Sequence, residues 1–286
     1  MRYLLLIGML VFFLGCSGGS DSSEASATDQ EIKDLNEIEL DPVVEGDWYK
    51  PSVKKSWHWQ LQGSINTNYD VDIYDIDLFD SDEDLIKSLQ DRDIKVICYF
   101  SAGSYENWRE DHESFPASVL GEELDNWEGE RWLDISNEEI YPIMQARLDL
   151  AAAKGCDGVE PDNMDGYTND TGFSLSSDEQ LIYNVFIANE ARARGLSVGL
   201  KNDLNQIERL EPYFDFVVNE QCHRYNECNL LEPFTDANKP VFNAEYDDKY
   251  FNSSQRDDLC QSASDLNFNT MFLPQALDDS FRYVCD

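Results

Sequence analysis

The segment at residues 158–164, with the sequence GVEPDNM, carries two carboxylates, Glu160 and Asp162. Side chains of a strand alternate between its two faces, so Glu160 and Asp162 point one way while Val159 and Pro161 point the other. Two like charges this close repel each other and are costly to bury unless a third group lies between them. A strand end of this kind indicates a working site, with a carboxylate-rich structural network or a cation site as the alternatives.

The chain around this segment alternates between strand-like and helix-like patterns. We expect helices at residues 83–92, 140–154 and 177–194, the last two followed by a glycine in the position of a C-cap. Parallel βα units follow from this order, and eight strands in about 240 residues predict an α/β fold, a single-domain (β/α)₈ TIM barrel. Residues 106–134, which contain three tryptophans, form a long insertion after the third strand, placed to roof the site. The predicted strands are residues 57–62, 72–78, 96–102, 158–163, 197–202, 214–220, 241–246 and 270–275.

Polar residues gather at the carboxyl ends of these strands. Barrel enzymes build their active sites on that face, and a barrel core would not otherwise tolerate so many polar side chains. The pattern therefore predicts a polar bowl at one end of the barrel. Its members are Asp75, Asp77, Ser101, Glu160, Asp162, Lys201, Asn202, Asn219, Glu220, Glu245, Tyr246 and Gln275.

The start of the chain predicts export. One basic residue precedes an apolar run at residues 3–14, too short to span a bilayer as a helix, and the Gly15–Cys16 pair resembles a bacterial lipobox. We expect residues 1–15 to be a lipoprotein signal peptide and Cys16 to be lipidated; the alternative is an ordinary signal peptide with Cys16 discarded. Residues 16–45 lack aromatics and predict a flexible acidic tether, which leaves residues 46–286 as the folded domain. The expected location is the cell surface or outer membrane of a bacterium, with the N-terminal lipid as the sole membrane contact.

The charge balance narrows the possible partners. With 58 acidic and 21 basic residues the formal net charge is −37, which argues against nucleic acid and anionic lipid. A cationic ligand is compatible with this charge, although a salt-adapted acidic surface would give the same balance. Three scattered histidines and no CxxC pair argue against a catalytic zinc, and we expect no cofactor. The acidic runs at residues 70–72 and 80–84 lack the EF-hand pattern; solvated turns are expected there, with an oxygen-ligated cation such as calcium as the alternative.

Six cysteines follow the tether, and an even number in an exported chain predicts disulfides. One pair closes a short loop, and a second would tie down the C-terminus. The third would form by elimination, or its two members would remain buried thiols. The expected pairs are Cys222–Cys228, Cys260–Cys285 and Cys98–Cys156.

Short motifs on the predicted strands carry a resemblance to a known family. They are WHWQLQG at 57–63, YDID at 74–77, CYFSAG at 98–103, GVEPDN at 158–163, GLKN at 199–202, NEQC at 219–222 and AEY at 244–246. In this order they resemble glycoside hydrolase family 114, over about Trp57 to Gln275. The resemblance implies a (β/α)₈ endo-α-1,4-polygalactosaminidase that cuts the partly deacetylated galactosamine polymer of microbial biofilms and fungal walls. It also implies a catalytic pair, Asp162 and Glu220.

The chemistry agrees with that pair. Cleavage of a glycosidic bond needs one carboxylic acid to protonate the leaving oxygen and one carboxylate to attack, or to activate water. By the family pattern Asp162 would be the nucleophile and Glu220 the general acid/base, with retention of configuration. The sequence leaves the two roles interchangeable and inversion open. A carboxyl separation of about 5–5.5 Å would support retention, and one above about 6.5 Å would support inversion.

Other bowl residues suit an amino sugar. Carboxylates can accept the three hydrogen bonds of a protonated galactosamine, and aromatic rings can stack on sugar faces or meet the ammonium by cation–π contact. Lys201 would hold nearby carboxylates ionised and lower their pKa. Trp59 and Tyr99 could instead fill the barrel, and Lys201 could be a structural counter-ion. The expected substrate-binding residues are Trp59, Gln60, Asp75, Asp77, Tyr99, Glu160, Lys201, Asn202, Glu245, Tyr246 and Gln275.

Two alternatives to a galactosaminidase remain, because a barrel says little about the substrate. One is an α-glycosidase of the same fold that acts on another, neutral glycan. The other is a non-catalytic glycan-binding lipoprotein, which the presence of both Asp162 and Glu220 disfavours. The expected partner is a cationic galactosamine-containing polysaccharide, and we expect the protein to be a monomer.

Overall fold

The computed structural model describes residues 41–247, 250 and 253–285, so the predicted signal peptide, Cys16 and most of the predicted tether lie outside it. One sheet dominates the described residues, with the strand order β1-β2-β3-β7-β8-β9-β10-β11-β12. Neighbouring strands from β1 to β11 are parallel, and β12 runs antiparallel to β11. The strands are β1 (Trp57–Gln60), β2 (Ile73–Asp77), β3 (Lys95–Ser101), β7 (Gly158–Asp162), β8 (Ser197–Lys201), β9 (Phe216–Glu220), β10 (Val241–Glu245), β11 (Asn269–Phe272) and β12 (Tyr283–Val284).

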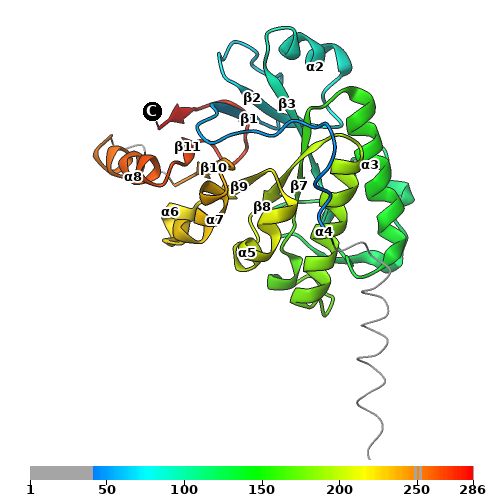
Figure 1. The fold of residues 1–286 in the computed structure, drawn as a ribbon. Coiled ribbons are helices and arrows are strands. Elements are labelled where there is room, and N and C mark those ends of the chain that lie inside the picture. Colours follow the sequence, from blue (N-terminus) through cyan, green and yellow to red (C-terminus); the bar gives the residue numbers. More distant parts are fainter. Residues whose placement is uncertain (1–40, 248–249, 251–252, 286) are drawn as a thin grey trace, which may run out of the picture. The chain divides into compact units, whose positions relative to one another are not determined.

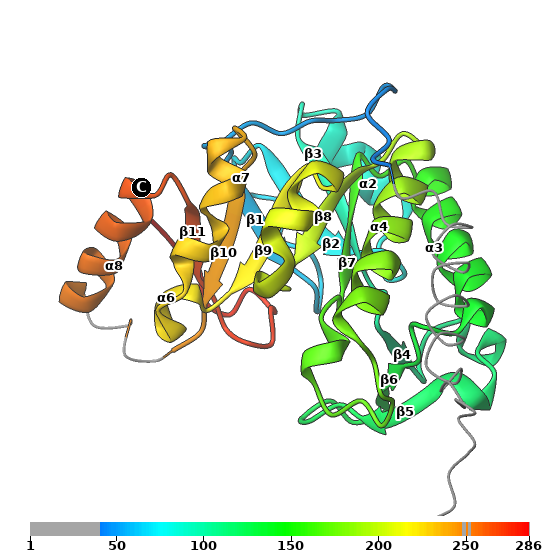
Figure 2. The same ribbon diagram turned by 60° about the horizontal axis from the view of Figure 1, so that its bottom comes forward.

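The helices lie outside the curled sheet (Figures 1 and 2). They are α2 (Glu83–Gln90), α3 (Tyr141–Lys154), α4 (Ser177–Ala193), α5 (Ile207–Leu210), α6 (Cys222–Tyr225), α7 (Glu232–Asp236) and α8 (Ser253–Asp265). Short 3₁₀ helices cover His112–Ser114, Ala117–Val119, Glu138–Ile140, Gly166–Thr168, Leu204–Gln206, Glu211–Tyr213 and Cys228–Leu231. None of the helices in these described residues is long and apolar enough to cross a membrane.

Local sequence explains where the long helices begin and end. Ser176 and Glu179 form a capping box at the start of α4, each side chain bonding the backbone of the other. Helix α3 ends at Gly155, whose left-handed φ of 84° is the C-cap geometry that its glycine predicts. The three long helices expected from the sequence are therefore confirmed as α2, α3 and α4.

The predicted TIM barrel is confirmed, with one difference at its seam. No ladder joins β1 to β11 in the described chain, because β12 pairs along the edge of β11. Loop contacts bridge the gap instead. The backbone amides of Leu61 and Gln62 both donate to the carbonyl of Leu277, at 3.0 and 3.2 Å, and the indole of Trp57 donates to the carbonyl of Asn269 at 3.0 Å.

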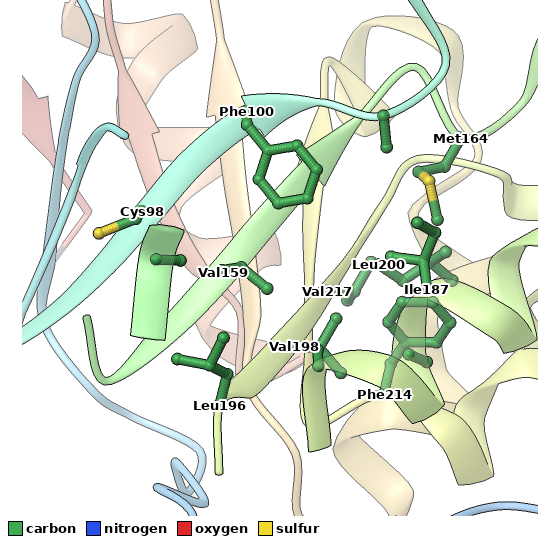
Figure 3. Close-up of a cluster of buried hydrophobic side chains, with 14 of the residues drawn as sticks. Cys98, Phe100, Val159, Met164, Ile187, Leu196, Val198, Leu200, Phe214 and Val217 are labelled. Carbon is green, nitrogen blue, oxygen red and sulfur yellow. The ribbon is translucent and has the colours of Figure 1, made fainter. Parts of the chain in front are cut away.

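Period-two alternation divides the apolar residues of the strands into two cores. Inside the barrel lie Trp57, Trp59, Ile73, Ile97, Phe216, Val218, Phe242, Ala244 and Met271. The other face of the same strands packs against the helices, and Figure 3 shows Val159, Val198, Leu200 and Ile187 within that layer. Alternation therefore decides which side chains of a strand can face the bowl.

The insertion after β3 forms a second, antiparallel sheet with the order β4-β6-β5. Its strands are β4 (Ser104–Glu106), β5 (Leu120–Glu123) and β6 (Glu130–Leu133), drawn in Figure 2 near α4. Two buried arginines hold the insertion on the barrel. Arg109 pairs with Asp77 of β2 at 2.6 Å, and Arg147 of α3 pairs with Asp111 at 2.7 Å.

The folded domain begins earlier than the predicted boundary at residue 46. The amide of Val43 donates to the side chain of Asn189 on α4 at 3.0 Å, and Arg192 donates to the Val43 carbonyl at 3.0 Å. Trp48 is buried, and its indole donates to Asp215 at 3.1 Å. The end of the predicted tether is thus part of the domain, because α4 supplies polar partners that the tether composition does not reveal.

All three expected disulfides are confirmed: Cys98–Cys156, Cys222–Cys228 and Cys260–Cys285. The first encloses 58 residues of sequence and links β3 to the turn before β7, the two strands that flank one side of the bowl. A cross-link over a loop of this length stabilises the fold by about 4 kcal/mol, chiefly by restricting the unfolded chain.

Candidate active site

A cavity of about 380 Å³ opens at the carboxyl ends of the strands. Residues at or after the ends of seven strands and from the insertion contribute to its wall, so the barrel and its insertion together shape the site. The lining residues are Trp59, Leu61, Tyr99, Leu124, Trp127, Glu130, Asp162, Asn163, Asp165, Lys201, Asn202, Glu220, Gln221, Tyr225, Tyr246, Gln275 and Leu277.

The ammonium of Lys201 lies at the floor of this cavity and joins three carboxylates. Its Nζ is 3.1 Å from Oδ1 of Asp162, 3.4 Å from Oε2 of Glu220 and 3.2 Å from Oε1 of Glu160. The indole ring of Trp59 makes a cation–π contact with it, with the ring centroid 4.8 Å from Nζ. Burial alone would lower the pKa of Lys201, but the surrounding carboxylates raise it well above its usual value, so the side chain stays charged.

Donors cover both oxygens of Asp162 at the end of β7. The Tyr99 hydroxyl donates to Oδ2 at 2.9 Å, and the Asn163 backbone amide donates to Oδ1 at 2.7 Å. Asn163 adopts the left-handed conformation, with φ of 61°, which turns its amide back toward that carboxylate. The turn packs on Gly103, where an added Cβ would lie 1.8 Å from the Asn163 carbonyl oxygen, so only glycine fits. The arrangement stabilises a carboxylate anion.

Glu220, at the end of β9, is held from two neighbouring strands. The Tyr246 hydroxyl donates to Oε1 at 2.7 Å, and the Asn202 side-chain amide donates to Oε2 at 3.1 Å. The Glu220 side chain is 30% exposed against 20% for Asp162, so Glu220 is the more open of the two to solvent and ligand.

Tyr99 and Tyr246 are permanent hydrogen-bond donors. Burial, followed by the charge of the carboxylate that each one contacts, raises the pKa of both hydroxyls well above 10.0. Each phenol therefore keeps its proton throughout the neutral range and donates to its carboxylate. Tyr99 is thus the phenol donor to Asp162, and Tyr246 is the phenol donor to Glu220.

Asp75 and Glu160 lie beneath the cavity rather than in its wall. They are 1% and 0% exposed, and Oδ1 of Asp75 and both oxygens of Glu160 receive no hydrogen bond from an amide or hydroxyl of the described residues. Neither side chain lines the cavity, so this position does not support their predicted role as direct sugar ligands.

Three other predicted ligands do not enter the bowl. Gln60 faces the outer side of β1 and binds backbone groups of the following loop, including the Ser64 carbonyl and the Asn66 amide. Alternation along β10 sends Glu245 to the face opposite Tyr246, where it accepts from the His223 amide at 2.9 Å. The carboxylate of Asp77 is engaged by Arg109 and by the Phe79 and Asp80 amides. The remaining predicted ligands, Trp59, Tyr99, Lys201, Asn202, Tyr246 and Gln275, line the cavity.

Several cavity residues escaped sequence reasoning because they lie in a loop or in the inserted sheet, outside the strands predicted for the barrel. Asp165 follows the Asn163 turn, and burial and the charge of Asp162 raise its pKa to about 6. Glu130 of β6 lies near Asn163 and Ser104, and burial raises its pKa to about 7. The density of tryptophan in the insertion was the signal for Trp127, which is 43% exposed at the cavity edge.

Two further cavities adjoin the first and are also acidic. One, of about 520 Å³, shares Trp127 and Asp165 with it and adds Glu122, Glu123, Asp125 and Asp170. The other, of about 280 Å³, shares Asp165 and Glu220 and adds Asp203 and Glu227. Acidic side chains therefore line all three adjoining cavities.

Cys222, His223 and Cys228 lie close enough together to hold a metal ion. The two cysteines are joined as a disulfide, so neither offers the thiolate that a metal requires. The group therefore serves to fix the loop that follows Glu220.

Comparison with known proteins identifies relatives that share this fold. The crystal structure of Aspergillus fumigatus Ega3 in complex with galactosamine matches with a TM-score of 0.80 and 43% sequence identity, covering 84% of this chain and 99% of Ega3. The glycoside hydrolase domain of PelA from Pseudomonas aeruginosa shares the fold at 12% identity, with a TM-score of 0.62 and coverage of 79% and 96%. A search of curated proteins finds no match. The sequence model of glycoside-hydrolase family GH114 matches residues 40–286. The chain is thus a glycoside hydrolase and belongs to family GH114.

Proposed function

We propose that this protein is an endo-acting α-1,4-galactosaminidase that cleaves partly deacetylated galactosaminoglycan with retention of configuration, using Asp162 and Glu220. One observation carries the proposal: a single buried ammonium, that of Lys201, contacts both carboxylates at the floor of the cavity. This contact holds the two carboxylates on one cation and so brings them close together.

The Lys201 contact also limits how far apart the two carboxylates can be. Oδ1 of Asp162 and Oε2 of Glu220 lie at most 6.5 Å apart, the sum of their distances to Nζ. Retaining glycosidases need about 5–5.5 Å between the carboxyl groups, and inverting ones about 6.5–9.5 Å to admit a water. The bound includes the spacing of a retaining mechanism and excludes the upper part of the inverting range for these two oxygens.

The surroundings of the two side chains support different roles. Asp162 receives a backbone amide, a phenol and an ammonium, which favour the anion that attacks the anomeric carbon. Glu220 is the more exposed, so a leaving oxygen and then a water can reach it. In the proposed sequence Glu220 protonates the leaving glycosidic oxygen as Asp162 forms the glycosyl ester. Glu220 then takes a proton from the water that hydrolyses the ester.

The acidic walls support a polycationic substrate. Carboxylates occur throughout the three adjoining cavities, and the one lysine or arginine among their described lining residues, Lys201, is buried and paired. The formal charge of −37 adds a long-range attraction for a cationic polymer and repels nucleic acid. Ega3, which is 43% identical, was crystallised with galactosamine, and this favours the same sugar here.

The proposed location is the bacterial cell surface or outer membrane, with the protein anchored as a monomer through a lipid on Cys16. The N-terminal sequence supports this: the lipobox-like Gly15–Cys16 pair follows the apolar run at residues 3–14. Labelling with a clickable fatty acid in a bacterial host, with Cys16→Ala as the control, tests the anchor.

The test of function is the release of reducing ends from α-1,4-galactosamine polymer, compared with the same polymer after full N-acetylation and with a neutral α-glucan. Release that falls with acetylation, and products of intermediate length, are expected. Nuclear magnetic resonance of the first-formed anomer would show the α form if configuration is retained. Cleavage of the neutral glycan alone would replace the proposal with a neutral-glycan glycosidase, and binding without cleavage would make the protein a lectin-like module.

A further inference from the structure

Two buried acids below the active site are not used by the proposed mechanism. Asp75 comes from β2 and Glu160 from β7, on either side of β3, and neither is more than 1% exposed. Both face the interior of the barrel, and Oδ1 of Asp75 and both oxygens of Glu160 are buried with no amide or hydroxyl donor among the described residues. Two neighbouring buried acids that lack other donors can satisfy each other only if one of them holds a proton and donates it, so the arrangement favours one neutral acid.

The surroundings assign that proton to Asp75. The Lys201 ammonium, 3.2 Å from Glu160, stabilises a negative charge on Glu160. No amide or hydroxyl in the described part of the chain donates to either Glu160 oxygen. A buried carboxylate needs such donors, and a protonated Asp75 supplies the one that is missing. In agreement, burial and then the charge of Glu160 raise the pKa of Asp75 well above 3.8.

Charge balance leads to the same assignment. If Asp75 were ionised, four carboxylates would share the single ammonium of Lys201 in a buried volume, and such uncompensated charge is very costly. With a neutral Asp75, three carboxylates share it, and the two that line the cavity are partly exposed to solvent. The titratable and charged groups that surround the pair are Lys201 from β8, Asp162 from β7, Tyr99 from β3, Glu220 from β9 and Tyr246 after β10.

We propose that Asp75 is a positioning residue that works in its protonated form, donating to Glu160 so that Glu160 anchors the Lys201 ammonium between Asp162 and Glu220. The chain of contacts runs from Asp75 to Glu160, to Lys201, and then to the two reacting carboxylates. Asp75 lies outside the cavity wall, so its effect falls on kcat rather than on KM. The kinetic part of this inference rests on the proposed function, whereas the location of the proton does not.

Infrared spectroscopy tests the proton directly in the folded protein, without turnover. Protein labelled with 4-¹³C-aspartate is expected to show, at neutral pH, an isotope-shifted C=O stretch of a protonated aspartic acid that disappears in Asp75→Asn. Asp203→Asn is the matched control, because it removes another buried acid and leaves the Asp75 band in place. An identical protonated-aspartate spectrum in wild type and Asp75→Asn would overturn the proposal.

Kinetics test the positioning role. Asparagine keeps a donor at this place and cannot ionise, whereas leucine has similar bulk and no donor. The kcat of Asp75→Asn on the galactosamine polymer should exceed that of Asp75→Leu by roughly tenfold or more, with similar KM. Equal losses in both folded variants would contradict the role. If Asp75→Leu does not fold, the kcat of Asp75→Asn decides, since a loss beyond about a hundredfold would show that a donor is not what the position needs.

The two measurements also separate this inference from the proposed function. A wild-type protein that shows the Asp75 band but cleaves no galactosamine polymer would refute the function and leave the protonated pair standing. A protein that cleaves the polymer but lacks the band would do the reverse.

Discussion

The ammonium nitrogen of Lys201 lies 3.1 Å from Oδ1 of Asp162, on the adjacent strand of the barrel. The same nitrogen contacts Glu220 and Glu160, so a single cation balances the carboxylates of the site. This makes Lys201 the electrostatic centre of the site, with the Trp59 ring in cation–π contact with it.

Replacing Lys201 by methionine should lower kcat by about a hundredfold, because removing one partner of a buried charge pair leaves the others uncompensated. The melting temperature should fall as well, for the same reason. Lys201→Arg, which keeps the charge, is the control and should lose less kcat than Lys201→Met. The account of the site would be contradicted by a folded Lys201→Met variant with a kcat within a few-fold of wild type.

The hydroxyls of Tyr99 and Tyr246 are expected to matter for the rate of catalysis. Tyr99→Phe and Tyr246→Phe each remove one hydrogen bond to a reacting carboxylate, worth about 1.5–3 kcal/mol for a charged acceptor, so kcat should fall roughly tenfold or more. Tyr183→Phe is the matched control. Its hydroxyl is also buried, but it donates to the Ala102 carbonyl, so its loss should lower the melting temperature and leave kcat nearly unchanged. Equal effects of all three on kcat would argue against the assigned contacts.

Trp127 is expected to bind the polymer from the insertion. It is 43% exposed and lines both the main cavity and the larger acidic one beside it. Trp127→Ala should raise KM for the polymer up to about tenfold, the effect of losing one stacking or cation–π contact, with a smaller change in kcat. Trp108, 50% exposed in the same insertion but outside both cavities, supplies the control, since Trp108→Ala should leave KM unchanged. A matching rise in KM for both variants would count against the assigned surface.

Stability should fall as pH rises from 5 to 9 because of Asp203. Burial, and then the charge of Asp165, raise the pKa of Asp203 from 3.8 to about 8. Between those values the native state holds a proton that the unfolded chain has lost, so the free energy of unfolding declines with pH and levels off above about 8. Asp203→Asn removes this dependence. Its melting temperature relative to wild type should rise between pH 5 and 9, by the equivalent of about 1 kcal/mol or more. A difference that does not change with pH would show that Asp203 is ionised in the native protein.

The strands and their order could be predicted from the sequence, because alternation and helix signals are local. Glu160 and Asp162 share a face, as period two requires, and both contact Lys201. The same rule, applied to Glu245 beside Tyr246, shows that the two cannot both face the bowl.

Other features depend on partners distant in the sequence and could not be predicted. Asp77 is engaged by Arg109, 32 residues away, which no local pattern signals. Asp165 enters the cavity through the left-handed turn at Asn163, and Glu130 enters through the insertion sheet. The seam between β1 and β11 follows from the pairing of β12, a strand of two residues at the end of the chain.

The most direct test of the central claim measures reducing-end release from deacetylated α-1,4-galactosamine polymer by wild type, Asp162→Asn and Glu220→Gln. Each substitution keeps the size of the side chain and removes its acid–base and nucleophilic chemistry. Turnover by wild type with a loss of about a hundredfold or more in both folded variants is the predicted result. Either variant retaining more than about a tenth of wild-type kcat, with its fold intact, would contradict the assignment of that carboxylate to the reaction.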